Sequence, residues 1–239
     1  MSKLKGFFVT GTDTEVGKTL VSGALILKLR EQGMKVIGFK PVVAGTYKDV
    51  NGNILNEDLE TLRIASNLEP QELSLCPYVL NEAAAPHLVA KHEGLKLELS
   101  VIMRSLHNIE NQADCVVTEG AGGLLIPLND EEDLGQFAQE TNLPIILVVG
   151  MKLGCINHAI LTHEAIKARK LTIAGWVGNA LSQEMPLLQE NILALQGRLD
   201  APFLGLIPVL PKELQKPDNS PYLIEAMNFA AKHIHLPKN

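Results

Sequence analysis

Apolar residues in this chain fall into two kinds of segment. Short continuous runs predict buried strands at residues 7–10, 36–40, 115–119, 145–149, 173–178 and 204–207. Longer segments, in which apolar residues recur every three or four positions, predict helices at residues 19–32, 58–66, 97–111, 134–140, 157–170, 186–199 and 221–232. Strands that alternate with helices indicate an α/β fold, with a parallel sheet and helices on both of its faces. We expect a single domain over residues 1–239.

Turn-forming residues mark several ends of these elements. Gly33 follows the first helical segment and is suited to end it, because glycine readily adopts the left-handed conformation found after helices. Residues 42–56 are rich in glycine and asparagine, so we expect a loop there, over one edge of the functional site. Residues 76–95 have no clear period, and we predict no element for them.

The composition is that of a globular protein whose main partner is not a nucleic acid. The 239 residues are 46% hydrophobic, which is enough for a core that needs no disulfides or structural metal. The formal net charge is −6 and no basic stripe is present, whereas binding to nucleic-acid phosphates needs clustered lysine and arginine.

Three further features predict a cytoplasmic protein with no membrane partner. Cys76, Cys115 and Cys155 are odd in number and far apart, so they predict neither a disulfide framework nor a CxxC metal site. The apolar run at residues 143–149 is far shorter than the roughly 20 residues that cross a bilayer. Residues 1–10 lead almost directly into the first strand and leave no room for a signal peptide.

A phosphate-binding loop is predicted between the first strand and the first helix. Residues 11–19 read GTDTEVGKT, which is one residue longer than the usual GxxxxGK[ST] pattern, because Gly11 lies seven positions before Lys18. The Lys18 ammonium would contact the β- and γ-phosphates, and the Thr19 hydroxyl would bind magnesium. The alternative is a glycine-rich turn whose lysine points into solvent. The strand before the loop and the helix after it favour nucleotide binding and a P-loop NTPase-like sheet.

Charged residues also follow two other predicted strands, at the edge where parallel sheets bind ligands. Glu119 ends one strand and precedes Gly120, Ala121 and Gly122, so it could be a second magnesium ligand or a solvated residue before a turn. Lys40 ends another strand, where it could stabilise a charged transition state or simply be exposed. Asp58 begins a predicted helix, and by itself it is better explained as a residue that complements the helix dipole.

Taken together, these motifs resemble the dethiobiotin synthetase family from residue 8 to about residue 209. The similarity is carried by VTGTDTEVGKT at 9–19, FKPV at 39–42, EGAGG at 119–123, VGMKLGCINH at 149–158 and AGWV at 174–177. The resemblance implies that ATP, carbon dioxide and 7,8-diaminononanoate react to give dethiobiotin, ADP and phosphate in biotin synthesis. One amine captures carbon dioxide as a carbamate, the carbamate attacks the γ-phosphate, and the second amine closes the ring.

The resemblance also assigns roles to individual residues. It implies catalytic roles for Lys40, Lys18 and Thr14. It also implies that Thr19, Asp58 and Glu119 bind magnesium. ATP is assigned to Glu15, Val16, Gly17, Lys18, Thr19, Leu20, Asp58, Glu119, Gly120, Ala121, Gly122, Asn179, Ile207, Pro208, Val209 and Glu213. Of these, Asn179 and the stretch from Pro208 to Glu213 match the end of the family's site that binds adenine.

The diamine is assigned to Thr14, Lys40, Ala44, Gly122, Gly154, Cys155 and Asn157. Gly154, Cys155 and Asn157 lie at a predicted helix start, whose free N–H groups could bind the substrate carboxylate. In the family this helix reaches the neighbouring subunit's site, so the resemblance predicts a homodimer with the substrate at the interface. Cys155 is better explained as a small residue in that turn than as a nucleophile.

Three positions differ from the family pattern. Ala44 stands where the family has a serine, so its hydrogen bond to the substrate must be absent or come from another group, such as Thr46. Ala180 replaces an aspartate that often follows the adenine-contacting asparagine, and Asn191 replaces a tyrosine that binds the substrate carboxylate. These differences affect the substrate and base contacts and leave the phosphate and metal residues unchanged.

Two other functions share parts of this pattern. A P-loop ATPase switch that positions a partner characteristically has an additional lysine early in the loop, where this chain has Thr12 and Asp13. A relative that amidates cobyrinate-type acids needs a source of ammonia, normally an added glutaminase domain. The predicted sheet already uses the 239 residues, which leaves no room for such a domain.

Overall fold

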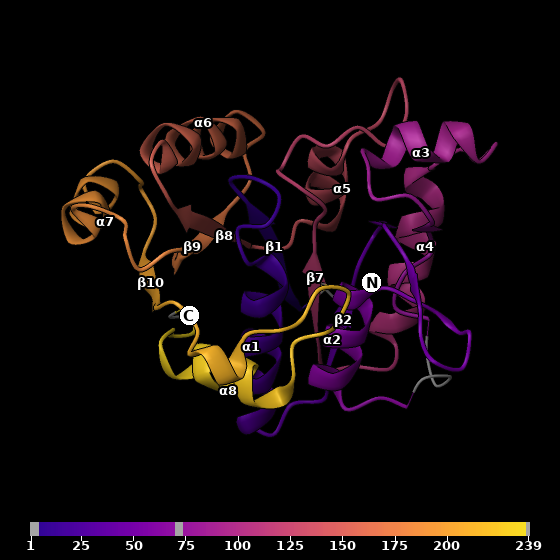
Figure 1. The fold of residues 1–239 in the computed structure, drawn as a ribbon. Helices are drawn as coiled ribbons and strands as arrows, with labels where there is room; N and C mark the ends of the chain where they lie inside the picture. The colour runs from indigo at the N-terminus through magenta and orange to yellow at the C-terminus, as the bar shows by residue number, and fades with distance from the viewer. Residues whose placement is uncertain (1–4, 70–73, 238–239) are drawn as a thin grey trace.

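The computed structural model describes residues 5–69 and 74–237, and its centre is a parallel sheet. The sheet has six strands in the order β10-β9-β8-β1-β7-β2 (Figure 1). Their bounds are β1 Gly6–Gly11, β2 Val36–Phe39, β7 Cys115–Glu119, β8 Ile145–Met151, β9 Ile173–Ala180 and β10 Phe203–Ile207. All neighbouring strands are parallel, so the predicted strands and the predicted kind of sheet are confirmed.

Helices cover both faces of the sheet. Their bounds are α1 Lys18–Glu31, α2 Glu57–Ser66, α3 Pro86–His92, α4 Leu99–Glu110, α5 Leu134–Thr141, α6 Cys155–Ala168, α7 Leu188–Gln196 and α8 Ile224–Lys232. In Figure 1, α1, α2 and α8 lie on one side of the sheet, and α5 and α6 lie on the other. Every predicted helix is present, with bounds shifted by at most a turn. The first helix ends as expected, because Gly33 has φ +83° and its N–H donates to the Arg30 carbonyl.

The prediction was incomplete at 42–56 and at 76–95. The expected loop at 42–56 contains three two-residue strands, β3 Val43–Ala44, β4 Tyr47–Lys48 and β5 Ile54–Leu55. β4 and β5 form an antiparallel pair, and β3 pairs with β6, Val79–Leu80. The helix α3 follows β6 and begins with a proline in its first turn. Strands of two residues are too short to produce an alternating pattern, so periodicity could not find them.

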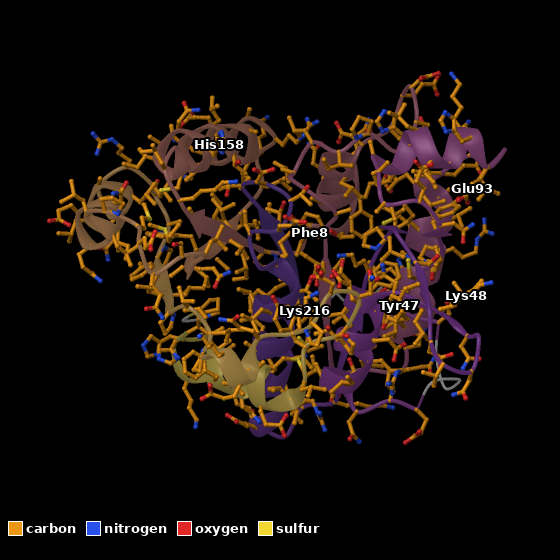
Figure 2. The ribbon with its side chains drawn as sticks, viewed as in Figure 1. Phe8, Tyr47, Lys48, Glu93, His158 and Lys216 are labelled. Carbon is orange, nitrogen blue, oxygen red and sulfur yellow. The ribbon has the colours of Figure 1, made fainter. Side chains whose placement is uncertain are left out.

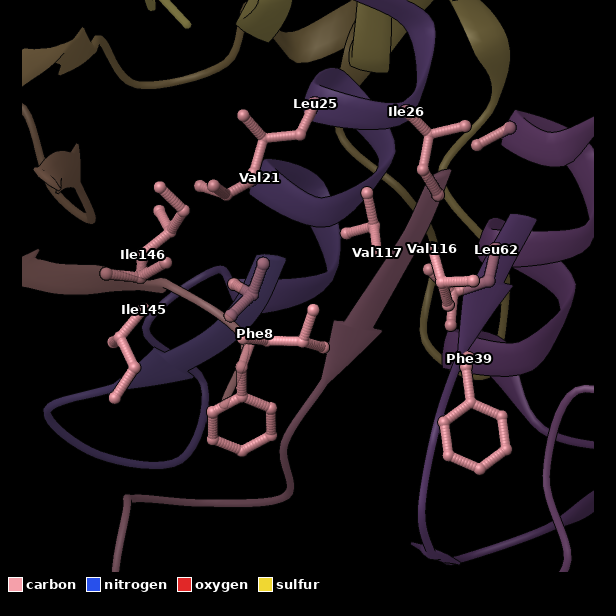
Figure 3. Packing of buried hydrophobic residues seen from close by; sticks show 14 of the residues in the cluster. Phe8, Val21, Leu25, Ile26, Phe39, Leu62, Val116, Val117, Ile145 and Ile146 are labelled. Carbon is pink, nitrogen blue, oxygen red and sulfur yellow. The ribbon is translucent and has the colours of Figure 1, made fainter. Parts of the chain in front are cut away.

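The core packs the sheet between these helix layers. Val21, Leu25 and Ile26 of α1 are buried against the strands, on the side that Ile146 and Val117 share (Figure 3). On the opposite side, the rings of Phe8 in β1 and Phe137 in α5 meet edge to face at 5.7 Å. Strands covered on both faces are hydrophobic throughout, which is why the predicted strands appear as continuous apolar runs.

The start of α2 is fixed by Asn56. Its side-chain oxygen accepts hydrogen bonds from the N–H groups of Asp58 and Leu59, which satisfies two free donors of the first turn. The same side chain donates to the Gly45 carbonyl at 2.7 Å, so the cap also holds the 42–56 segment. Asp58 is therefore held in the first turn of α2, where an acidic residue complements the helix dipole.

The last part of the described chain returns to the sheet beside β10. The N–H of His235 donates to the Leu204 carbonyl at 2.7 Å. Gly205 has φ +137°, and a Cβ at this position would lie 2.1 Å from the His233 carbonyl oxygen. Only glycine fits both this conformation and this contact. Among the described residues no helix is both long and apolar enough to cross a membrane.

Replacing Gly205 should therefore destabilise the fold. We expect Gly205→Ala to lower the free energy of unfolding by about 3 kcal/mol, because it adds backbone strain and a clash with residue 233. Urea denaturation followed by circular dichroism measures the change. Gly197→Ala is the matched control, since φ is −80° there and the added Cβ meets its nearest atom at 3.7 Å. Equal stability of the two variants would contradict this account.

Candidate functional site

The candidate site lies at the carboxyl end of three neighbouring strands. β1, β7 and β2 lie side by side in the sheet, and each leads into a segment with predicted functional residues. The phosphate loop follows β1, Glu119 ends β7, and Lys40 follows β2 directly. Val9 and Glu119 are register partners, which places the carboxylate beside the start of the loop. The topology thus brings together residues that are far apart in the sequence.

The loop between β1 and α1 has the conformation of an anion-binding turn. Gly17 has φ +92° and Glu15 has φ +59°, so two of its residues are left-handed. Lys18 begins α1, is buried, and donates from Nζ to the Asp13 carbonyl at 2.8 Å. The ammonium therefore lies across the loop, where a phosphate would sit. The alternative of a solvent-exposed lysine in a glycine-rich turn is wrong.

Four side chains form a cluster beside this loop: Thr19, Lys40, Asp58 and Glu119. The Lys40 ammonium lies 2.6 Å from Asp58 Oδ2 and 2.6 Å from Glu119 Oε1. The Thr19 hydroxyl lies 2.6 Å from Asp58 Oδ1 and 2.9 Å from Glu119 Oε1. Lys40 and Glu119 are buried, so neither is the exposed residue that the alternatives from sequence allowed. Asp58 contacts both Thr19 and Lys40 and does more than complement a helix dipole.

Burial and neighbouring charges shift the pKa of every ionisable group here. Burial, followed by the charge of Lys40, lowers the pKa of Lys18 to about 8. For Lys40, burial opposes the charged form, but the two carboxylates outweigh it and raise the pKa. Burial also dominates at Glu119 and raises its pKa, whereas at Asp58 the interactions led by Lys40 overcome burial and lower it. Such perturbed groups gathered at one edge are typical of an active site.

The oxygens of this cluster fit a magnesium ion. Glu119 Oε2 is buried and has no hydrogen-bond partner among the described residues, so one ligand position is free. Thr19 and Asp58 add a hydroxyl and a second carboxylate, and magnesium prefers such oxygen ligands. The described part of the chain has no group of three or more His, Cys, Asp and Glu side chains suited to a metal. Magnesium needs none, because it is usually held by one or two carboxylates together with substrate phosphates.

Two predicted substrate residues, Thr14 and Gly122, lie next to each other. The N–H of Thr14 donates to Asp13 Oδ1 at 2.8 Å. Gly122 has φ +57°, and a Cβ there would lie 3.5 Å from Thr14 Oγ1 and 2.9 Å from Ile126 Cδ1. A larger residue would fill the space beside the threonine hydroxyl. Gly120 and Ala121 connect this glycine to Glu119, so the segment joins the carboxylate cluster to the loop.

The residues predicted to bind adenine gather at the ends of β9 and β10. Asn179 and Ile207 are register partners, and Pro208 and Val209 continue from Ile207. Asn179 is buried, and its Nδ2 donates to the carbonyl of Val16 in the phosphate loop at 3.0 Å. Glu213 lies further on, in the short 3-10 turn Lys212–Leu214. Asn179 thus connects this end directly to the loop, a contact that the sequence analysis did not anticipate.

Gly154, Cys155 and Asn157 lie at the N-terminus of α6, as expected. Gly154 has φ +92°, and within the described chain no side chain caps the helix. The first-turn N–H groups are therefore suited to a carboxylate. Cys155 is buried and its burial raises the pKa of the thiol, which agrees with a structural role. Asn191, which replaces the family's tyrosine, has its Oδ1 3.9 Å from Cys155 Sγ.

Thr46 and Lys152 each contact a neighbouring segment. The Thr46 hydroxyl, a candidate to replace the serine missing at Ala44, lies 3.4 Å from Asn81 Oδ1. Lys152 Nζ lies 3.0 Å from Asp13 Oδ2, which ties the segment before α6 to the phosphate loop. Lys152 belongs to the 149–158 motif, but a lysine in a loop gives no sequence signal for its partner. Asp13 and Lys152 are both part-exposed, so the pair contributes little stability.

The buried lysine and carboxylate should stabilise each other. We expect Glu119→Gln to lower the free energy of unfolding by about 3 kcal/mol without ligands, because it removes one partner from a buried ion pair. Chemical denaturation at neutral pH measures this. Glu110→Gln is the control, because Glu110 is 3.7 Å from a part-exposed histidine and should matter little. If Glu119→Gln is as stable as this control, the cluster is not an interdependent unit.

Comparison with known structures shows that the chain has the fold of P-loop NTPases. A family model described as an AAA domain (AAA_26) matches residues 5–217. The cell division ATPase MinD of Pyrococcus furiosus superposes with a TM-score of 0.55 at 16% identity, over 96% of this chain and 98% of that one. A ParA family ATPase from Chlorobium tepidum gives 0.54 at 14% identity, over 96% and 90%. At these identities the likeness is one of fold alone.

The sequence relatives are much closer, and they share one name. ATP-dependent dethiobiotin synthetase BioD of Nitrosospira multiformis is 47% identical over 85% of this chain and 88% of the relative. The enzyme of the same name from Ralstonia nicotianae is 47% identical over 86% and 89%, and that from Vibrio vulnificus is 40% identical over 93% and 99%. The motifs that carry the site all lie within the matched family model. The chain therefore belongs to the ATP-dependent dethiobiotin synthetase family.

Proposed function

We propose that this chain uses ATP to carboxylate 7,8-diaminononanoate with carbon dioxide and to close the product into dethiobiotin, in biotin synthesis. The observation that carries the proposal is the joining of the phosphate loop to the cluster of Thr19, Lys40, Asp58 and Glu119. This arrangement supplies two ammonium groups and three oxygen ligands at one edge of a sheet. It is suited to transferring a phosphoryl group between two bound oxygens.

The chemistry proceeds in three steps. One substrate amine adds to carbon dioxide and loses a proton, which gives a carbamate. A carbamate oxygen then attacks the γ-phosphorus of ATP, and the bond to the β-phosphate oxygen breaks to release ADP. Finally, the second amine attacks the carbonyl carbon of this mixed anhydride, loses its proton and expels phosphate. None of these steps needs a nucleophile from the protein, which agrees with the buried thiol of Cys155.

The protein's part in these steps is to position groups and to stabilise charge. Lys18 would contact the phosphates from within the loop, and Thr14, beside Gly122, would hold the carbamate through its hydroxyl. Lys40 would stabilise negative charge on the carbamate and on the transferring phosphoryl group. The two carboxylates beside it outweigh its burial and keep it charged at neutral pH.

Magnesium would be held by Thr19, Asp58 and Glu119. When bound, it neutralises charge on the triphosphate. The unpaired Glu119 Oε2 and the Thr19 hydroxyl support this assignment. The Lys40 ammonium, which both carboxylates share here, would then be available to the reacting oxygens.

The substrate carboxylate would bind at the N-terminus of α6 in a homodimer. Gly154, Cys155 and Asn157 form this end, and its N–H groups carry the positive end of the helix dipole. Two leucines of this segment are exposed: Leu153, just before α6, is 99% exposed and Leu161, within α6, is 60% exposed. Covering these two leucines with a second copy would complete both sites.

We place the reaction in the cytoplasm. Cys76, Cys115 and Cys155 are free thiols in the structure, which suits a reducing compartment. ATP is also available there. The substrates in this proposal are small molecules, so neither a nucleic acid nor a membrane takes part.

The rival functions have less support. MinD and ParA ATPases share the fold with this chain at 14–16% identity, which is too low to indicate a shared function. Where a switch of that kind would have its early lysine, Asp13 uses its carboxylate to bind Lys152 and the Thr14 N–H. An amide ligase of the cobyrinate type is less well supported, because the relatives described above, at 40–47% identity, are named dethiobiotin synthetases.

An assay of substrate dependence tests the function. Purified protein is incubated with ATP, magnesium, bicarbonate and 7,8-diaminononanoate, and mass spectrometry detects the product. Dethiobiotin should form only with all components, and ADP release should depend on the diamine. ATP turnover indifferent to the diamine would favour a switch, and ligation with ammonia that needs no carbon dioxide would favour an amide ligase.

Loss of the loop lysine should abolish turnover. We expect Lys18→Ala to lower kcat by at least about 100-fold, because it removes a preorganised charge from the transferring phosphoryl group. Steady-state assays measure the rate, and far-ultraviolet circular dichroism checks the fold. Lys167→Ala, in the last turn of α6, removes an equal charge away from the loop. Near-normal activity of Lys18→Ala would exclude its proposed role.

The proposed dimer depends on the exposed face of α6. We expect Leu161→Glu to shift the protein toward monomers and to raise the KM for the diamine, because a charge in an apolar interface must be desolvated. Sedimentation velocity measures the oligomeric state. Leu88→Glu provides a control on α3, where the leucine is 50% exposed. A wild-type monomer, or a Leu161→Glu dimer with normal KM, would contradict this arrangement.

A further inference from the structure

The sequence analysis left the chain beyond Glu213 without a role, but the structure places part of it against the site. After the 3-10 turn Lys212–Leu214, the chain crosses in front of α1 and α2 before it enters α8 (Figure 1). We call residues 215–222 the C-terminal strap. Lys216 lies within it, near the centre of the view in Figure 2.

Several contacts fix the strap to the first turns of α2. Lys216 Nζ lies 2.6 Å from Glu57 Oε2, with side chains only 23% and 38% exposed. The N–H of Tyr222 donates to Thr61 Oγ1 at 2.9 Å, and that hydroxyl donates to the Glu57 carbonyl at 2.7 Å. The ammonium also lies 5.5 Å from the centre of the Tyr222 ring, within reach of a cation–π interaction. The strap therefore holds Glu57 through both its side chain and its backbone.

Glu57 immediately precedes Asp58, a residue of the site. Asp58 bonds to Thr19 and Lys40, so a shift in the first turn of α2 would move one wall of the cluster. Tyr222 is joined to the same helix through Thr61, and burial, followed by the charges of Glu57, Asp58 and Glu119, raises its pKa to about 12. The strap is thus within the electrostatic reach of the site.

Lys216 offsets the charge of Glu57, which directly precedes Asp58 of the cluster. Glu57, Asp58 and Glu119 are three carboxylates, whereas Lys18 and Lys40 are two ammonium groups. Lys216 supplies the third positive charge. A nucleotide brings several further negative charges, and an uncompensated carboxylate beside the site would oppose its binding.

We propose that Lys216 is a positioning residue for nucleotide binding, which neutralises Glu57 and holds the first turn of α2 so that Asp58 keeps its place. This inference rests on the proposed use of ATP. It gives the C-terminal strap a function in the reaction without assigning it any contact with the reacting atoms.

The role of Lys216 can be separated from direct contact with the nucleotide. If Lys216 acts through Glu57, adding Lys216→Met to Glu57→Gln should cause no further loss of affinity. If Lys216 instead binds the nucleotide itself, the double variant should bind more weakly than Glu57→Gln alone. Lys216→Arg keeps the charge and should keep the affinity.

The experiment is calorimetric titration with ADP, with and without magnesium, of the full chain and its variants. We expect Lys216→Met to weaken ADP binding about fivefold, the scale of a part-exposed ion pair. Lys216→Met combined with Glu57→Gln should bind within about twofold of Glu57→Gln alone. Lys232→Met, in the last turn of α8, loses the same charge away from α2 and should match the wild type.

Thermal unfolding of each variant without nucleotide shows whether a loss of affinity reflects a loss of fold. Wild-type affinity in Lys216→Met would overturn the inference, and so would a double variant that binds much more weakly than Glu57→Gln alone. An equal loss in Lys232→Met would overturn it too, because the effect would then be one of net charge. A wild-type chain that binds no ADP would overturn this inference and the use of ATP together, whereas the other outcomes leave the use of ATP intact.

Discussion

The site depends on one buried ammonium group shared by two carboxylates. Lys40, directly after β2, joins Glu119 at the end of β7 to Asp58 in the first turn of α2, with 2.6 Å to each. Charges are costly to bury unless they are paired, so each of the three residues needs the other two. These ion pairs therefore connect α2 to the ends of β2 and β7. They also bring negative charge to the edge of the phosphate loop, where a divalent cation would be needed.

Much of this arrangement was predictable because it follows from local patterns. The parallel strands are apolar runs, the helices have a helical period, and GTDTEVGKT between a strand and a helix is typical of a phosphate-binding loop. Glu119 and Lys40 were also found, since charged residues at the ends of apolar runs in a parallel sheet gather at one edge. The sequence alone left open whether either was simply exposed. Their burial follows from the strand order β1-β7-β2, which no local pattern encodes.

What the sequence could not provide are contacts between segments without a period of their own. Asp58 looked like a residue that complements a helix dipole, because its partners Thr19 and Lys40 come from other elements. The pairs Asp13–Lys152 and Glu57–Lys216 join exposed-looking charges across long stretches of chain. The short strands between 43 and 55, and α3, were not predicted for a different reason, because each is too short to show periodicity. The family resemblance supplied roles for residues, but it did not supply these contacts.

The contact between Gly17 and Asn179 has a consequence for redesigning the enzyme. A side chain at position 17 would meet the Asn179 amide at 2.2 Å, and the same amide holds the Val16 carbonyl of the loop. The end of the site assigned to the base and the end assigned to the phosphates therefore share one residue. An attempt to change the preferred nucleotide by altering position 179 would also disturb the loop. A substitution at position 179 would therefore act on both ends of the site at once.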